Sequence, residues 1–127
     1  MPIHSASIYV APNHFHMKVL PGNKISLVDG VPFEGIKPSG NALFESVAKV
    51  YGPRAIAAIL SGMGHDGTIG LKKIKEAGGR IIAQDEKTSV IFGMPKSAIE
   101  AGVVDHIFPI EQIGPHLVQM LQERVTK

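Results

Sequence analysis

The sequence lacks cysteine and tryptophan, and aromatic residues make up only 6% of its 127 positions. The absence of cysteine excludes disulfides, a thiol nucleophile and a cysteine-ligated zinc site, and it fits a reducing compartment. The charge excess is small as well, with 13 basic and 11 acidic side chains and a net charge of +2. A protein held on nucleic acid by phosphate contacts usually carries a larger excess, so the composition argues against nucleic-acid binding.

Long apolar runs are also missing, since none approaches the roughly 20 residues that a membrane-spanning helix needs. Met1 to Ser7 has neither the basic start nor the apolar core of a signal peptide. Hydrophobic residues nevertheless form 44% of the chain and charged residues 19%, a balance that excludes intrinsic disorder. We therefore expect one folded domain, or part of a larger one, with no membrane insertion.

Two kinds of pattern follow one another along the chain. Residues 7–33 form short β-rich segments, starting at Ile8 to Val10, and turn residues at 21–23 predict a β-hairpin region. From the cap residue Ser39 to position 124, amphipathic helices alternate with apolar strands. Because the first of these strands is apolar throughout, both of its faces are expected to be buried. Pro115 is expected in the first turn of the last helix, since proline interrupts a helix interior. The strands are expected at 55–60, 80–83 and 103–108.

Parallel strands joined by helices form right-handed crossovers, so this pattern predicts an α/β fold with a parallel sheet and an N-terminal hairpin. Ligands in such folds bind beyond the carboxyl ends of the strands. The loops that follow the three strands are therefore the places where a site is expected. These loops are 61–67, 84–93 and 109–111.

Glycines punctuate the first loop, Ser61 to Gly67. They permit positive φ and a close approach of the backbone, and amides at the start of the next helix can hold an anion or stabilise an oxyanion. Asp66 can cap that helix or hold an imidazole in orientation, and both interpretations stay open. If Asp66 only caps the helix, asparagine should replace it with little loss of stability. We do not expect His65 to pair with Asp66, because adjacent side chains point in different directions.

Other chemistry-bearing side chains give weaker signals. His14 and His16 lie two apart on an extended segment and could face a metal together, but no third ligand is evident. We expect solvated histidines near a turn and no metal site. No serine stands in a G-x-S-x-G nucleophile elbow. The chain thus offers a carboxylate loop without a nucleophile of its own.

A set of short runs spread over residues 8 to 121 carries a family resemblance. The runs are Ile8 to Pro12, His16-Met17, Pro38-Ser39, Leu43-Phe44, Ser46 to Ala48, Leu60 to Gly67, Gly78-Gly79, Ile82 to Glu86, Thr88 to Pro95 and Ala98-Ile99. Together they resemble the bacterial chemotaxis protein-glutamate methylesterases. The resemblance implies that residues 1–127 are the C-terminal part of the catalytic domain, with the hairpin region at 7–33 and the βα units at 39–124. The implied fold is a doubly wound, Rossmann-like three-layer α/β domain, here incomplete.

Members of that family hydrolyse glutamate γ-methyl esters on the cytoplasmic helices of chemoreceptors and deamidate certain receptor glutamines, with a Ser-His-Asp triad and no cofactor. The resemblance implies that Asp66 is the triad aspartate, which orients the histidine and stabilises the imidazolium. It implies that the Met63 N–H, with the neighbouring Gly62 and Gly64, belongs to the oxyanion loop. It also implies a cytoplasmic hydrolase of the chemotaxis phosphorelay. Its partners would be methylated chemoreceptors and, in regulated relatives, a receiver domain.

The sequence departs from the family in one large respect. The family's serine and histidine motifs both precede the segment that Ile8 to Pro12 resembles, so the resemblance implies that the chain alone lacks two triad members and is inactive. His16-Met17 follows Phe15 and is not the missing histidine motif. Smaller departures are Lys37, where the family usually has arginine, and Gly40-Asn41, where it has an apolar residue and then aspartate.

Alternatives of two other classes remain open. The chain can be a catalytically inactive module of the same fold that binds receptors or another partner. It can also be a domain whose glycine loop holds a small anion and has no esterase role. In a partial domain the apolar strand at 55–60 lies near an edge of the sheet, so we expect exposed apolar surface and self-association.

Overall fold

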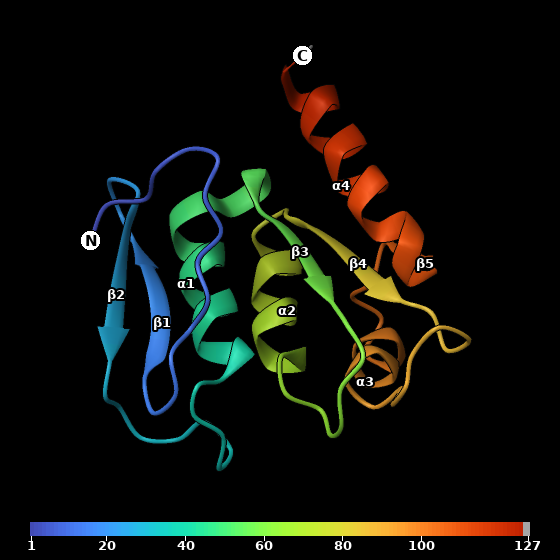
Figure 1. Ribbon diagram of the computed structural model, residues 1–127, viewed down its shortest axis with the longest axis horizontal. Helices are drawn as coiled ribbons and strands as arrows, with labels where there is room; N and C mark the ends of the chain where they lie inside the picture. Colours follow the sequence, from blue (N-terminus) through green and yellow to red (C-terminus); the bar gives the residue numbers. More distant parts are fainter. Residues whose placement is uncertain (126–127) are drawn as a thin grey trace.

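The computed structural model describes residues 1–125, so the last two residues of the expected domain 1–127 lie outside the described part. Two strands come first, and helices then alternate with three further strands (Figure 1). None of the helices within the described residues is long and apolar enough to cross a membrane. The elements are β1 (His16–Leu20), β2 (Lys24–Val28), α1 (Gly40–Tyr51), a 3-10 turn (Gly52–Arg54), β3 (Ile56–Ile59), α2 (Thr68–Glu76), β4 (Arg80–Gln84), α3 (Met94–Glu100), β5 (His106–Phe108) and α4 (Ile110–Val125).

Turn residues fold the first two strands onto each other. β1 and β2 pair antiparallel, and between them Gly22 and Asn23 have φ of +85° and +55°. Glycine and asparagine adopt this left-handed conformation more easily than other residues. The predicted hairpin is confirmed. The strand expected at Ile8 to Val10 is wrong: Ile8 is 94% exposed, and no strand among residues 1–125 pairs with this segment.

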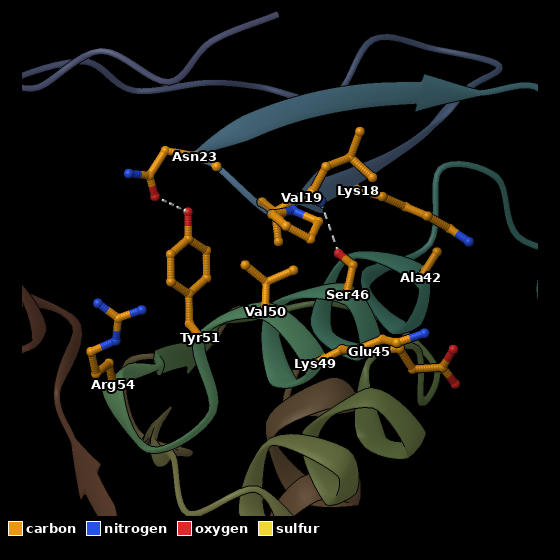
Figure 2. Close-up of a pocket in the computed structure, with 13 residues that line it drawn as sticks. Lys18, Val19, Asn23, Ala42, Glu45, Ser46, Lys49, Val50, Tyr51 and Arg54 are labelled. Carbon is orange, nitrogen blue, oxygen red and sulfur yellow. Dashed lines mark hydrogen bonds between the residues drawn. The ribbon is translucent and has the colours of Figure 1, made fainter.

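A serine cap starts α1, as the sequence predicts. Ser39 is extended, and its Oγ accepts the N–H of Asn41, which satisfies one of the free amides at the helix start. The hairpin holds this helix in place, since the Val19 N–H donates to Ser46 Oγ over 3.0 Å and the Tyr51 hydroxyl donates to Asn23 Oδ1 over 2.8 Å. Figure 2 shows both contacts beside a hollow of about 830 Å³ between the hairpin and α1. The N-terminus of α1 therefore has a fixed place in the fold.

Three parallel strands, in the order β3-β4-β5, form the central layer. On one face, side chains of α1, α2 and α3 pack on the sheet around the fully buried Leu71, Ile74 and Ile81. On the other face, Ile113 and Met120 of α4 pack on Ile82 of β4. Helices thus cover both faces, which confirms the doubly wound α/β fold with its hairpin. The apolar side chains whose spacing predicts these βα units are the ones that pack in the core.

Two of these elements differ from the simplest expectation: β3 lies at the edge of the sheet, as expected for a partial domain, and Pro115 lies where it was not expected. Burial of β3 is one-sided: Ala57 and Ile59 are buried, whereas Ile56 and Ala58 are only half-buried. The reason is that β3 lies at the edge of the described sheet and the buried side chains of α4 pack on β4. Pro115 lies inside α4, beyond its first turn. It is exposed there, so water can hydrate the carbonyl that the missing N–H leaves without a partner.

Candidate active site

The loop between β3 and α2 lies at the carboxyl edge of the sheet, where the sequence predicts a site. Its first half is fixed to the segment before α3: the Gly62 N–H donates to the Ile91 carbonyl over 3.0 Å, and the Gly62 carbonyl accepts the Met94 N–H over 2.8 Å. A Cβ at Gly62 would lie 2.5 Å from the Met94 sulfur. A side chain at Gly62 would therefore have to displace the Met94 side chain, which glycine avoids.

Asp66, in the second half of the loop, faces the N-terminus of α1. The Ser39 hydroxyl donates to Asp66 Oδ1 over 2.6 Å, and the Gly40 N–H donates to Oδ2 over 2.8 Å. The amide of Asn41 is a third, longer donor to Oδ1, at 3.4 Å. The positive end of the α1 dipole favours a carboxylate here as well. The half-buried Asp66 side chain is therefore held in one orientation before any partner arrives.

Asp66 does not cap the helix that follows it. The N-cap of α2 is Gly67, with φ of +97° and no side-chain hydrogen bond. The interpretation that Asp66 caps the next helix is therefore wrong. The helix that Asp66 contacts is α1, which starts more than twenty residues earlier in the sequence. A carboxylate has about four acceptor positions, and three donors contact this one. It retains capacity for one further donor, such as an imidazole N–H.

Asn41 is a site residue whose role the sequence analysis missed. Its side-chain Oδ1 accepts the Gly70 N–H of α2 over 2.7 Å, while its side-chain amide contacts Asp66. A Cβ at Gly70 would lie 2.9 Å from the Asn41 Cα, so a glycine allows the two helices to meet. Asn41 is 1% exposed. The departure from the family's aspartate at this position was the available signal, because a buried amide can donate and accept where a carboxylate only accepts.

The two histidines of the hairpin region separate in the structure. His16 is buried, with only 4% of its surface exposed, so the expectation of a solvated histidine is wrong for this residue. Its Nδ1 accepts the Ser39 N–H at 3.2 Å, and its Nε2 lies 2.9 Å from the Val31 carbonyl. Both ring nitrogens therefore have partners within the fold, whereas His14 is exposed. Among residues 1–125 no group of three or more histidine and acidic side chains could hold a metal.

His65 turns away from its neighbour Asp66. Its Nε2 lies 2.8 Å from a carboxylate oxygen of Glu34, at the tip of the segment between β2 and α1. Both side chains are exposed, so the contact adds little stability. On the same segment, the Lys37 ammonium donates to Asp29 and to the Gly30 carbonyl, and the hydrogen bond and charge of Lys37 lower the pKa of Asp29. Lys37 thus holds this segment two residues before Ser39, the N-cap of α1.

Met63 lies between the two anchored parts of the loop. Its side chain is 80% exposed. Within the described part of the chain its backbone N–H donates to no acceptor, unlike that of Gly62. The next residue, Gly64, has φ of +87°, a conformation that lets the backbone turn sharply. The loop thus presents a free N–H, which is what an oxyanion hole needs.

The second expected loop contributes support to the first. The buried Gln84, at the end of β4, accepts the Ser61 N–H over 2.8 Å and donates to the Thr88 carbonyl over 2.9 Å. The Ser61 hydroxyl in turn exchanges hydrogen bonds with the backbone of Ile91. Ser61 therefore links the two loops through its hydrogen bonds. The hollow of Figure 2 is lined by none of these residues and is separate from the candidate site.

Comparison with known proteins identifies relatives of this chain. The family model described as CheB methylesterase matches residues 1–117. The protein-glutamate methylesterase/protein-glutamine glutaminase of group 3 operon of Rhizobium meliloti is 44% identical over 118 residues, which are 93% of this chain and 33% of that protein. Protein-glutamate methylesterase FrzG of Myxococcus xanthus is 43% identical over 89% of this chain and 34% of its own length.

A solved structure shares the fold. The CheB methylesterase catalytic domain of Thermotoga maritima superposes with a TM-score of 0.86 at 37% identity, over 88% of this chain and 61% of that domain. The chain thus spans about one third of the length of these two curated relatives and somewhat more than half of the solved domain. The family match covers the glycine loop, the α1 N-terminus and the hairpin alike, and the chain belongs to the CheB methylesterase family.

Proposed function

We propose that this chain supplies the aspartate and the oxyanion loop of a cytoplasmic serine esterase that acts in chemotaxis signalling. The esterase hydrolyses glutamate γ-methyl esters on chemoreceptors and deamidates receptor glutamines. The relatives named as protein-glutamate methylesterase/protein-glutamine glutaminase support this substrate class. The observation that carries the proposal is the Asp66 carboxylate, which three donors from α1 hold at the carboxyl edge of the sheet.

Each residue of the loop has a distinct role in the proposed reaction. In this proposal a serine attacks the ester carbonyl as a histidine takes its proton, and both residues come from outside this chain. Asp66 accepts the Nδ1–H of that histidine, which fixes its tautomer and stabilises the imidazolium. The free N–H of Met63 donates to the oxygen that becomes negative in the tetrahedral intermediate, with Gly62 and Gly64 shaping the backbone around it.

A chimera tests the proposal. In it, this chain replaces the matching part of the Thermotoga maritima catalytic domain, and methanol release from methylated chemoreceptors is measured. We expect the folded chimera to release methanol and the isolated chain to release none. A chimera that unfolds cooperatively on heating but has no activity would contradict the proposal and favour an inactive binding module. Activity of the isolated chain at the rate of the intact domain would contradict the division of the triad.

A further inference from the structure

We propose that His16 is a positioning residue for the Asp66 carboxylate, acting through the backbone of Ser39. This inference rests on the proposed function, because it assigns His16 a part in orienting the triad aspartate. The residues form a continuous chain of hydrogen bonds: His16 Nδ1 accepts the Ser39 N–H, and the Ser39 hydroxyl donates to Asp66 Oδ1.

The partners of the ring define its protonation. An amide N–H can only donate, so Nδ1, which faces the Ser39 N–H at 3.2 Å, must be the unprotonated acceptor. The hydrogen of the neutral ring is then on Nε2, and it donates to the Val31 carbonyl at 2.9 Å. Both hydrogen bonds are made by a side chain that is 4% exposed, where a lost bond is not replaced by water.

The imidazole bridges the two ends of the segment that leads from β2 into α1. Val31 lies near the start of this segment and Ser39 at its end, and the ring contacts the backbone of both. The backbone also passes close to the ring at Gly30, where an added Cβ would lie 3.7 Å from His16 Cδ2. His16, on the hairpin strand β1, therefore fixes the place where the chain enters α1.

That entry point decides where the carboxylate is held. The Ser39 hydroxyl accepts the Asn41 N–H at 3.0 Å, so its single hydrogen is left for Asp66 Oδ1. The next amide along the chain, that of Gly40, donates to Oδ2. Both of the short hydrogen bonds to the carboxylate thus come from backbone positions that the Ser39 N–H anchors. A shift of Ser39 moves both donors together.

A buried histidine can also do no more than stabilise the fold. Two substitutions separate the roles, because each keeps one of the two hydrogen bonds. In His16→Asn the amide oxygen lies as many bonds from Cα as Nδ1 and can accept the Ser39 N–H. In His16→Gln the amide nitrogen reaches the place of Nε2 and can donate to Val31. A purely structural role predicts similar losses from both variants, whereas the positioning role predicts that only His16→Gln impairs catalysis.

The first measurement is kinetic and uses the chimera described above. We expect His16→Gln to lower kcat about 10- to 100-fold with KM little changed, since small misplacements of a catalytic group cost rate and not binding. His16→Asn should keep kcat within about 3-fold of the parent, because it restores the acceptor for Ser39. The exposed His14→Gln is the matched control. Equal losses of kcat in His16→Asn and His16→Gln would overturn the proposal.

The second measurement uses the 127-residue chain itself and needs no activity. In ¹⁵N-labelled protein, the ring nitrogens of His16 should show the Nε2–H tautomer, and the Gly40 amide proton should be shifted downfield by the carboxylate. We expect His16→Gln to remove that downfield shift and His16→Asn to keep it. If the Gly40 shift is the same in both variants, the positioning proposal fails. An inactive parent chimera with these shifts intact would instead count against the proposed function alone.

Discussion

The two ends of the loop between β3 and α2 differ in how completely this chain holds them. Asp66 receives hydrogen bonds from the Ser39 hydroxyl, the Gly40 N–H and the Asn41 amide, all from the start of one helix. Met63, three residues earlier, has an exposed side chain and a backbone N–H that no acceptor contacts among residues 1–125. The carboxylate is thus preorganised inside the chain. In the proposed function, the Met63 N–H gains a partner only when the oxyanion forms during the reaction.

Asp66→Asn should have the largest effect, because it removes the charge at the preorganised end. By analogy with other triads we expect a fall of about 10⁴ in kcat of the chimera. The fold should also lose about 1–2 kcal/mol, since one side of the new amide carries an NH₂ that faces a donor, either the Gly40 N–H or the Ser39 hydroxyl. Methanol release and urea unfolding measure the two effects. The exposed Glu111→Gln, on α4, is the matched control, and an Asp66→Asn variant with near-normal turnover would show that Asp66 is not the triad aspartate.

Met63→Pro removes the N–H at the other end of the loop. We expect kcat to fall about 10²- to 10³-fold, the usual cost of one oxyanion donor. The fold should be less affected, because this N–H has no partner among the described residues. Met63→Ala keeps the N–H, so it should lose far less activity than the proline variant. Similar rates in both variants, measured with the same ester substrate, would show that the Met63 backbone does not stabilise the oxyanion.

Ser39→Ala tests how much of the carboxylate's placement depends on one hydroxyl. It removes the 2.6 Å hydrogen bond to Asp66 and the cap of α1. We expect about a 10-fold loss in kcat by misplacement of the carboxylate, and about 1 kcal/mol in unfolding free energy from the lost cap. Ser39→Thr retains the hydroxyl and should recover most of both. If Ser39→Ala lost stability but no activity, the remaining donors would suffice to place Asp66.

The edge of the sheet should matter least for catalysis, but it should affect association of the chain. β3 pairs only with β4 among the described strands, and Ile56 and Ala58 are half-buried. An unpaired edge with apolar neighbours favours pairing with another chain. We expect sedimentation velocity to show concentration-dependent association of the isolated chain, and Ala58→Lys to reduce it. A monodisperse monomer at millimolar concentration would contradict this expectation.

The sequence predicts local features well and long-range partners poorly. The Ser39 cap, the turn at Gly22-Asn23 and the glycine loop are each encoded within a few residues, and all are found where expected. The contact of Asp66 with Gly40 joins residues 26 apart in sequence, and no local pattern reveals it. The burial of His16 has the same cause, because its partner Ser39 is 23 residues away. Resemblance to the family assigned a role to Asp66, but not the helix that holds it.

The one-sided burial of β3 and the position of Pro115 have a common physical basis. An apolar run shows that a strand can be buried on both faces, but the neighbours in the fold decide whether it is. For β3 the second face is only partly covered. A proline is excluded from a helix interior only where its missing hydrogen bond cannot be replaced. In α4 the proline lies on the exposed side, where the carbonyl without a partner is open to solvent.

The most direct test of the account is the proposed contact between Asp66 and a catalytic histidine. In the ¹H spectrum of the chimera, an imidazole Nδ1–H bonded to a carboxylate gives a strongly downfield resonance. We predict that this resonance is present in the parent and in Glu111→Gln, and absent in Asp66→Asn. A resonance that persists unchanged in a folded Asp66→Asn chimera would show that another group holds the histidine, and would contradict the central claim.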